Sequence, residues 1–314
     1  MSLYKDSFLA LKNIMNKEKT ALLIDSDALL HISYNGSLKT PSYTELGIPN
    51  FCVRQFIYSY SKTIKDLGVD DTVFVFDHKD PTFRHLMADN YKGDRKEKDL
   101  ELVIQEDFIK DIIEHSGFKS LTVSGYEADD VLVSLANKMV EELGYDKVYI
   151  GTSDKDIYQC ITDKIHIFNL RKKEVINKDN ILEHFPVEVD KVVSYLCLVG
   201  DTADNVNGIE GVGNKRAIDL LNYFGDFISI FDTIHQVHHK EIGIPKTVWD
   251  RLVKIQEEND PIVEHNLKMI TLVKDIELPD DYTTNEVVSD ELRQKLDDLE
   301  LHFIGDVRFY GRHK

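Results

Sequence analysis

The sequence has few cysteines, few prolines and no long apolar run. Its three cysteines are far apart and lack the spacing of a zinc site, which excludes a disulfide framework and indicates a reducing cytoplasm. No segment approaches about 18 consecutive apolar residues, so we expect no membrane span. Residues 2–20 have helical spacing and lack the apolar core of a signal peptide. Apolar residues nevertheless make up 42% of the 314 residues, which excludes wholesale disorder.

Positive charge is also scarce. The chain carries 38 Lys and Arg against 56 Asp and Glu, a formal charge of −18. Taken alone, this excess argues against a nucleic-acid partner, because an acidic surface repels phosphates. The acids are concentrated, however. Nine, counted without Asp27, stand in the short segments described below, and ten lie within residues 275–300, where only Arg293 and Lys295 oppose them. The rest of the chain is close to neutral.

Apolar periodicity predicts an α/β domain followed by a helical one. Short apolar or β-branched runs at 21–24, 72–76, 120–123 and 147–150 alternate with helical periods at 51–67, 102–116 and 127–143. This alternation is typical of a parallel sheet with helices on both faces. Further helices are expected at 191–199, 215–224, 227–234 and 248–258. We therefore expect an α/β domain over 1–186, with a helical extension at 1–20, and a helical domain over 187–314.

Acidic residues recur where the predicted strands stop. Ligands of an open parallel sheet bind outside the carboxyl ends of its strands, so acids from several strands would share one pocket. A further pair stands where the helical region begins. The acids are Asp25, Asp27, Asp77, Glu127, Asp129, Asp130, Asp154 and Asp156 after the strands, and Asp201 and Asp204 in the later pair.

Each of these acids alone has a simpler explanation as a helix cap, a first-turn residue or a turn residue. Their conjunction is costly, because two carboxylates about 4 Å apart repel by about 4 kcal/mol at an effective dielectric of about 20. Bound cations would relieve that cost. Oxygen donors without His or Cys suit Mg²⁺ or Mn²⁺, and two such ions about 3.5–4 Å apart clamp a phosphodiester for hydrolysis. The pattern therefore predicts metal-dependent phosphoryl chemistry.

A basic stretch follows Asp77 directly. Basic side chains interleaved with aromatic ones can hold phosphates and stack a base, whereas the alternative is a solvated charged loop. Its position beside the predicted metal pocket favours the first interpretation. The stretch contains Lys79, Phe83, Arg84, Tyr91, Lys92, Arg95, Lys96 and Lys98.

A glycine turn at 208–216 opens onto a predicted helix. It is not a nucleotide-binding Walker loop, because Asn214 separates Gly213 from Lys215 and no Ser or Thr follows the lysine. Free backbone N–H groups at the helix start, with Lys215 and Arg216 beside them, suit a nucleic-acid phosphate. The alternative is a helix-turn-helix packing corner.

Several collinear motifs carry a family resemblance. The segments GYEADD, TSDKD, GDTADN and GIEGVGNKRA, preceded by FD, FRH and YKGDR, resemble the 5′-nuclease (flap endonuclease) family. That family includes the 5′-nuclease domain of bacterial family A DNA polymerases and free-standing bacteriophage enzymes. The match runs from about 25 to 224, and more loosely to 273. It implies a PIN-like, Rossmann-like α/β fold with a mostly parallel sheet, a helical arch at about 84–107 and a C-terminal helix-three-turn-helix region.

The resemblance also implies roles for individual residues. A first metal position would be held by Asp25, Asp77, Glu127, Asp129 and Asp130, and a second by Asp154, Asp156, Asp201 and Asp204. Lys92 and Arg95 would be the catalytic cations at the scissile phosphate. DNA contacts would come from Arg84, Lys96 and Tyr91, the last stacking on a displaced nucleotide, and from Gly211, Gly213, Lys215 and Arg216, which would grip duplex phosphates where the family often holds K⁺.

The chain departs from the family pattern at Ser26, His31, Ile32 and Asp94 but keeps all nine matching acids. We therefore expect a free-standing, monomeric, cytoplasmic enzyme of the bacteriophage type. It would be a 5′→3′ exonuclease and flap endonuclease that uses two Mg²⁺ ions, with Mn²⁺ as a substitute. Its substrates would be branched or flapped DNA, with RNA/DNA primer junctions as a further candidate. The alternatives are a structure-specific DNA-binding protein with weak cleavage and a PIN-like RNase, which would need neither the arch nor the glycine turn.

Overall fold

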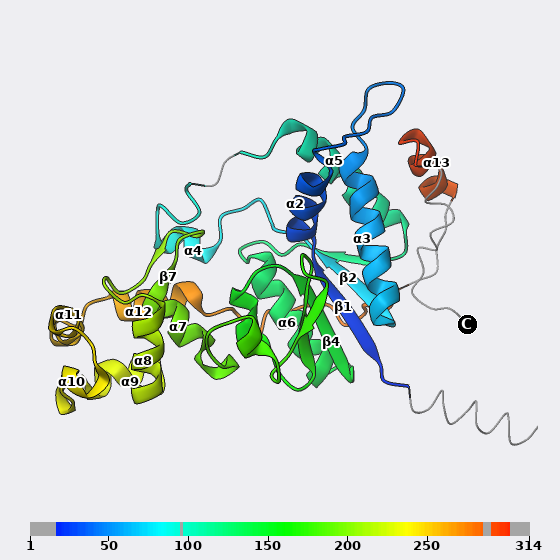
Figure 1. Ribbon diagram of the computed structural model, residues 1–314. Coiled ribbons are helices and arrows are strands. Elements are labelled where there is room, and N and C mark those ends of the chain that lie inside the picture. The colour runs from blue at the N-terminus through cyan, green and yellow to red at the C-terminus, as the bar shows by residue number, and fades with distance from the viewer. Residues whose placement is uncertain (1–16, 95–96, 285–289, 302–314) are drawn as a thin grey trace, which may run out of the picture.

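A six-stranded sheet forms the centre of the computed structural model, which describes residues 17–94, 97–284 and 290–301 (Figure 1). The strand order is β3-β2-β1-β4-β5-β6, and only the pairing of β6 with β5 is antiparallel. The expected mostly parallel α/β sheet is thus confirmed. The strands are β1 (Thr20–Asp25), β2 (Asp71–Val75), β3 (Lys119–Leu121), β4 (Lys147–Thr152), β5 (Ile165–Asn169) and β6 (Glu174–Ile176).

Helices cover both faces of the sheet, which explains why its central strands have continuous apolar runs. In β1, Leu22 and Ile24 pack into one apolar cluster, whereas Ala21 and Leu23 pack into another on the opposite face. The first face is covered by α2 (Ser26–Ser37), α3 (Phe51–Leu67) and α5 (Leu100–His115), with α13 (Asp290–Asp298) packed against α5, and the second by α6 (Ala128–Glu141). Most of the expected helical extension lies outside the described residues.

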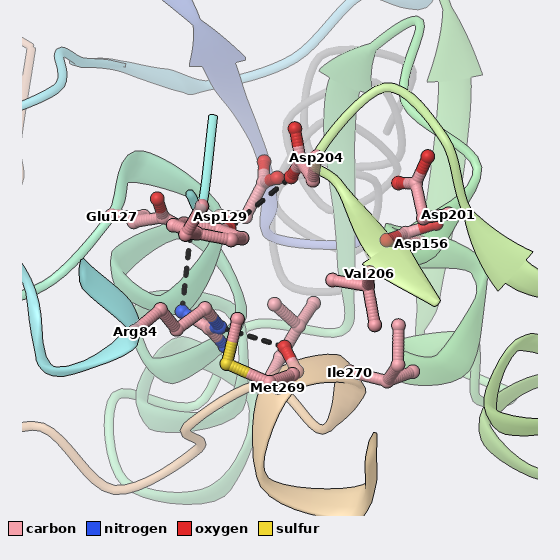
Figure 2. A pocket seen from close by; sticks show the side chains of 11 residues that line it. Arg84, Glu127, Asp129, Asp156, Asp201, Asp204, Val206, Met269 and Ile270 are labelled. Carbon is pink, nitrogen blue, oxygen red and sulfur yellow. Dashed lines mark hydrogen bonds and ion pairs between the residues drawn. The ribbon is translucent and has the colours of Figure 1, made fainter. Parts of the chain in front are cut away.

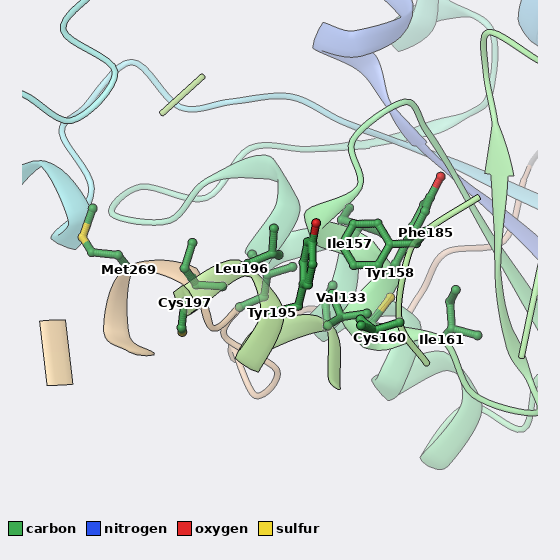
Figure 3. Packing of buried hydrophobic residues seen from close by; sticks show 14 of the residues in the cluster. Val133, Ile157, Tyr158, Cys160, Ile161, Phe185, Tyr195, Leu196, Cys197 and Met269 are labelled. Carbon is green, nitrogen blue, oxygen red and sulfur yellow. The ribbon is translucent and has the colours of Figure 1, made fainter. Parts of the chain in front are cut away.

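The remaining helices gather beside the α/β part, as the sequence predicts for its later region (Figure 1). They share its apolar core through a row of aromatic rings: Tyr158 and Phe185 are 5.8 Å apart between centroids, and Phe185 and Tyr195 are 5.3 Å apart (Figure 3). This packing holds the short 3₁₀ helix η1 (Asp156–Cys160) at the junction. The elements are α7 (Val192–Val199), the hairpin β7 (Gly200–Asp201) and β8 (Val206–Asn207), α8 (Asn214–Phe224), α9 (Phe227–Thr233), α10 (His239–Ile242), α11 (Lys246–Glu257) and α12 (Ile262–Ile270).

After α12 the chain returns to the α/β part and ties the two parts together. Ser134 in α6 donates a hydrogen bond to the Val273 carbonyl (3.1 Å), and the Thr284 N–H donates to Asp71 in β2 (2.9 Å). Part of the acidic C-terminal stretch is paired here, because Asp280 forms an ion pair with Lys138 (2.7 Å). Within the described ranges, no helix is long and apolar enough to cross a bilayer.

Candidate functional site

The sheet has a topological switch point between β1 and β4, since the chain leaves β1 toward β2 and β3 and returns to β4 on the other side. Asp25, the last residue of β1, lies at this point. Its carboxylate accepts hydrogen bonds from the Thr152 hydroxyl at the end of β4 (2.7 Å) and from the Ala28 N–H (2.9 Å). Burial outweighs these bonds and raises the pKa of Asp25 to about 7.

Asp77 stands two residues beyond β2 on the same edge of the sheet. Its carboxylate accepts from the Ala128 N–H at the start of α6 (2.8 Å), and its own N–H donates to Asp27 (2.9 Å). Burial and the nearby charge of Asp27 raise the pKa of Asp77. The other Asp27 oxygen accepts from Lys98 (3.0 Å). The first two strands therefore deliver their acids to one place.

The three acids at the start of α6 have different surroundings. Glu127 caps the helix, with Asp130 completing a capping box. Asp129 is affected by the acids of the strand ends. Burial and the charges of Asp154 and Asp25 raise the pKa of Asp129 well above its usual value. Asp130 is fully buried and accepts two hydrogen bonds from Arg84 (2.6 and 3.0 Å).

Arg84 is placed differently from the sequence-based expectation of a DNA contact. It is 1% exposed, and besides Asp130 it donates to the Met269 and Thr271 carbonyls (2.8 and 3.1 Å). A further nitrogen–oxygen contact of 3.2 Å joins it to Glu127. Arg84 is therefore a buried residue of this structure. The Asp130 carboxylate is likewise buried and paired with Arg84, and its role as a metal ligand stays a prediction.

Tyr91 also points inward. It is 5% exposed, and its hydroxyl lies 2.9 Å from Glu127 and 3.2 Å from Asp204. This placement does not present the ring for stacking on a displaced nucleotide, which differs from the expectation. Lys92 remains at the pocket, with its ammonium 2.6 Å from Glu127 and 3.7 Å from Asp204. The expected residues Arg95 and Lys96 lie outside the described residues.

A second group of acids comes from the loop after β4 and from the β7–β8 hairpin. Burial and the charges of Asp154, Asp201 and Asp204 raise the pKa of Asp156 to about 8. The charge of Asp154 contributes to the raised pKa of Asp129 as well, so it acts on both groups. The hairpin is held by backbone-to-backbone packing, because a side chain on Gly200 would overlap the backbone near Gly208.

A hollow of about 310 Å³, partly open to solvent, lies among these side chains (Figure 2). Acids occupy one side of it and apolar residues the other. Within the described part of the chain, no three His, Cys, Asp or Glu side chains are close enough to coordinate one ion as they stand. The donor chemistry nevertheless fits a hard cation, because buried carboxylate oxygens lie beside others of the same charge. The lining residues are Arg84, Tyr91, Glu127, Asp129, Asp156, Asp201, Asp204, Val206, Met269, Ile270 and Leu272.

The glycine turn lies at the start of α8. Gly211 has a φ of +85°, a conformation that suits glycine, and its carbonyl accepts a hydrogen bond from Arg216 (2.6 Å). Arg216 thus helps to hold the turn itself. Gly213 caps α8 without a side-chain hydrogen bond, and Lys215 is exposed in the first turn of the helix. The turn therefore presents backbone donors and one exposed cation to solvent.

Thr152 is a site residue that the sequence reasoning missed. Besides donating to Asp25, its hydroxyl accepts from the Asp154 N–H (3.1 Å), so it joins the ends of β1 and β4. A Thr directly before Ser-Asp at a strand end, in TSDKD, is the signal that indicates such a bridging hydroxyl.

The fold and the site define an α/β nuclease with a carboxylate pocket at the switch point of its sheet. The family model described as "5'-3' exonuclease, N-terminal resolvase-like domain" matches residues 20–186, and that described as "5'-3' exonuclease, C-terminal SAM fold" matches 187–294. The chain therefore belongs to the 5′-3′ exonuclease family, which confirms the resemblance found in the sequence.

Relatives and solved structures agree with this assignment. The chain is 30% identical over 287 residues to the 5′-3′ exonuclease of Aquifex aeolicus, covering 90% of this chain and 93% of that protein. It is 35% identical over 216 residues to the thermostable DNA polymerase I of Thermus aquaticus, covering 69% and 25% respectively. The T5 D15 flap endonuclease in a complex with DNA and metal ions has a similar fold, with a TM-score of 0.63 at 22% identity over 90% of this chain and 99% of that chain. The Rad2 catalytic core with DNA has a TM-score of 0.54 at 17% identity over 90% and 88%.

Proposed function

We propose that this protein is a Mg²⁺-dependent 5′→3′ exonuclease and flap endonuclease that cuts DNA near junctions of a 5′ single strand and a duplex. The observation that carries the proposal is the convergence of carboxylates from several strand ends and the β7–β8 hairpin on one edge of the sheet, next to the Lys92 ammonium. Such a site suits phosphodiester hydrolysis, because cations can stabilise charge that develops on the phosphate.

The acids divide into two candidate metal positions. Divalent ions, when bound, would supply an activated water and stabilise the leaving oxygen. Glu127 and Asp130 would act mainly through their cationic partners, Lys92 and Arg84, to which they are already paired. The first position would use Asp25, Asp77 and Asp129, the second Asp156, Asp201 and Asp204, and Asp154 would serve between them.

Lys92 would hold a non-bridging oxygen of the scissile phosphate. Its side chain is 14% exposed and its ammonium already lies between Glu127 and Asp204, so it can move from a carboxylate to a phosphate over a short distance. The exchange would place the ammonium beside the phosphate, where negative charge develops in the transition state.

The glycine turn would bind the duplex away from the pocket. An exposed Lys215 and the backbone N–H groups at the start of α8 suit a backbone phosphate, since both attract an anion without reading sequence. The T5 and Rad2 neighbours were crystallised with DNA, which supports DNA as the class of substrate. We propose that the protein acts as a monomer, with K⁺ as a candidate ligand of the turn.

Cleavage of an end-labelled 5′-flap with mapped products tests the proposal. We expect Mg²⁺-dependent cuts near the junction that chelation abolishes and that Asp154→Asn reduces by at least about 100-fold. Asp163→Asn is the matched control, because Asp163 is an exposed acid paired with Lys178 on the surface (3.0 Å). Tight DNA binding without cleavage in Mg²⁺ or Mn²⁺ would instead indicate a structure-specific binding protein. Cleavage confined to single-stranded RNA would favour the PIN-like RNase.

A further inference from the structure

Arg84 in α4 (Phe83–Met87) lies where three separate segments of the chain meet. Its Nε donates to the Met269 carbonyl at the end of α12 (2.8 Å), and its Nη2 donates to the Thr271 carbonyl (3.1 Å). The same guanidinium makes two hydrogen bonds to Asp130 in the first turn of α6 (2.6 and 3.0 Å). Figure 2 shows it below Glu127 and Asp129, next to Met269. One side chain thus joins α4, α6 and the end of the helical region.

A chain of contacts leads from Arg84 into the pocket. Its Nη1 lies 3.2 Å from Glu127, and Glu127 in turn lies 2.6 Å from the Lys92 ammonium and 2.9 Å from the Tyr91 hydroxyl. Lys92 and Tyr91 then reach Asp204 in the β7–β8 loop. The contacts therefore begin at the Met269 and Thr271 carbonyls at the end of α12 and finish at Asp204, which also belongs to the helical region.

A buried ion pair of this kind contributes little net stability compared with apolar packing, because both charges lose their hydration. The guanidinium instead contributes a fixed, planar arrangement of hydrogen-bond donors. Its planar fork can hold Asp130 on two nitrogens while the same group also contacts Glu127 and two carbonyls, which an ammonium on a flexible stem cannot do.

We propose that Arg84 is a positioning residue for phosphodiester hydrolysis, an inference that rests on the proposed function. By holding Glu127 and Asp130 against the carbonyls of Met269 and Thr271, it fixes the Lys92 ammonium relative to the acids of α6. Docking of the helical region thereby determines the position of a cation in the pocket. Arg84 acts through Glu127 and does not touch the substrate.

Arg84→Lys keeps the charge and removes the fork. Glu127, and through it Lys92, is then no longer held in a fixed position. A displacement of about 1 Å at a reacting group costs about 100-fold in rate. We expect kcat for 5′-flap cleavage to fall about 10- to 100-fold. KM should change by less than about 3-fold, because the duplex contacts at the glycine turn are separate from this cluster.

The test measures kcat and KM for Arg84→Lys, for Glu127→Gln and for the double variant, with the folded fraction of each from urea unfolding. If Arg84 acts through Glu127, the second substitution lowers kcat little further in the Arg84→Lys background. A role in stability alone would lower kcat only in proportion to the unfolded fraction. Asp130→Asn, which keeps an acceptor for the Val273 N–H (2.9 Å), serves as a second variant should Arg84→Lys not fold.

Two results overturn the inference while the proposed function stands: a wild-type kcat in a folded Arg84→Lys or Asp130→Asn variant, or effects of Arg84→Lys and Glu127→Gln that multiply in full. A wild-type chain that does not cleave the flap overturns the proposed function and this inference together. A fall in kcat at unchanged KM, with effects that do not multiply, supports the inference.

Discussion

Replacing Thr152 with Val removes a hydroxyl from the switch point without changing the size of the side chain appreciably. That hydroxyl donates to the Asp25 carboxylate (2.7 Å) and accepts from the Asp154 N–H (3.1 Å). The Asp25 pKa is already raised to about 7 by burial, and the Thr152 hydrogen bond is one of the contacts that limit the rise. The variant should therefore raise the Asp25 pKa further.

The magnitude follows from the hydrogen bond. A hydrogen bond to a charged group contributes about 1.5–3 kcal/mol, which corresponds to about 1–2 pKa units. At about pH 7 the ionised fraction of Asp25 would fall from about one half to between about one tenth and one hundredth. Because a metal ion binds the ionised form, the Mg²⁺ concentration for half-maximal cleavage should rise about 5- to 50-fold.

The assay is flap cleavage as a function of Mg²⁺ concentration, at about pH 7 and again above about pH 9. The deficit should shrink at the higher pH, where Asp25 is ionised in both proteins. Thr152→Ser keeps the hydroxyl and should resemble the wild type. An unchanged Mg²⁺ requirement in Thr152→Val, or a deficit that is the same at both pH values, would refute the reasoning.

Three further outcomes are expected. Lys215→Glu should weaken duplex binding and lower the slope of log affinity against log salt by about 1 or more in fluorescence titrations, and an unchanged slope would argue against a phosphate contact. In chelator, the urea midpoint should fall as the pH rises from about 5 to about 8, because folded Asp25 and Asp156, with pKa values of about 7 and about 8, keep protons that the unfolded chain has lost. Asp156→Asn should flatten this fall, and a midpoint that rises over the same range would contradict it. Gly200→Ala should lower stability by more than about 1 kcal/mol and reduce cleavage, since Gly200 has a φ of +78° and no room for a side chain, whereas Gly36→Ala in open space should do neither.

Long amphipathic helices and the strands β1 to β4 were predictable from the sequence, and the last two strands of the sheet were not. The helix predicted at 51–67 coincides with α3, and that predicted at 127–143 overlaps α6, because each has several turns of apolar spacing. The strands β5 and β6 have five and three residues and were not predicted. Their pairing with β4 and with each other is decided by long-range contacts, which local spacing does not reveal.

Two interpretations of the same acid can both hold. Asp25 ends β1 and also caps α2 by accepting from the Ala28 N–H, so the simpler explanation as a helix cap is correct without removing Asp25 from the pocket. Glu127 likewise caps α6 while it contacts Lys92. A helix start at the carboxyl end of a strand places both roles on one residue.

The sequence alone determined the kind of donor and the edge of the sheet at which it lies. Acids after successive strands must meet at one edge, because parallel strands end on the same side. Only the tertiary structure decided which cations face that edge. Arg84 looks like a DNA contact within its basic segment, yet it is buried against the carbonyl of Met269, 185 positions later. Whether a charged side chain is buried depends on partners that are distant in the chain, and the local sequence does not indicate these partners.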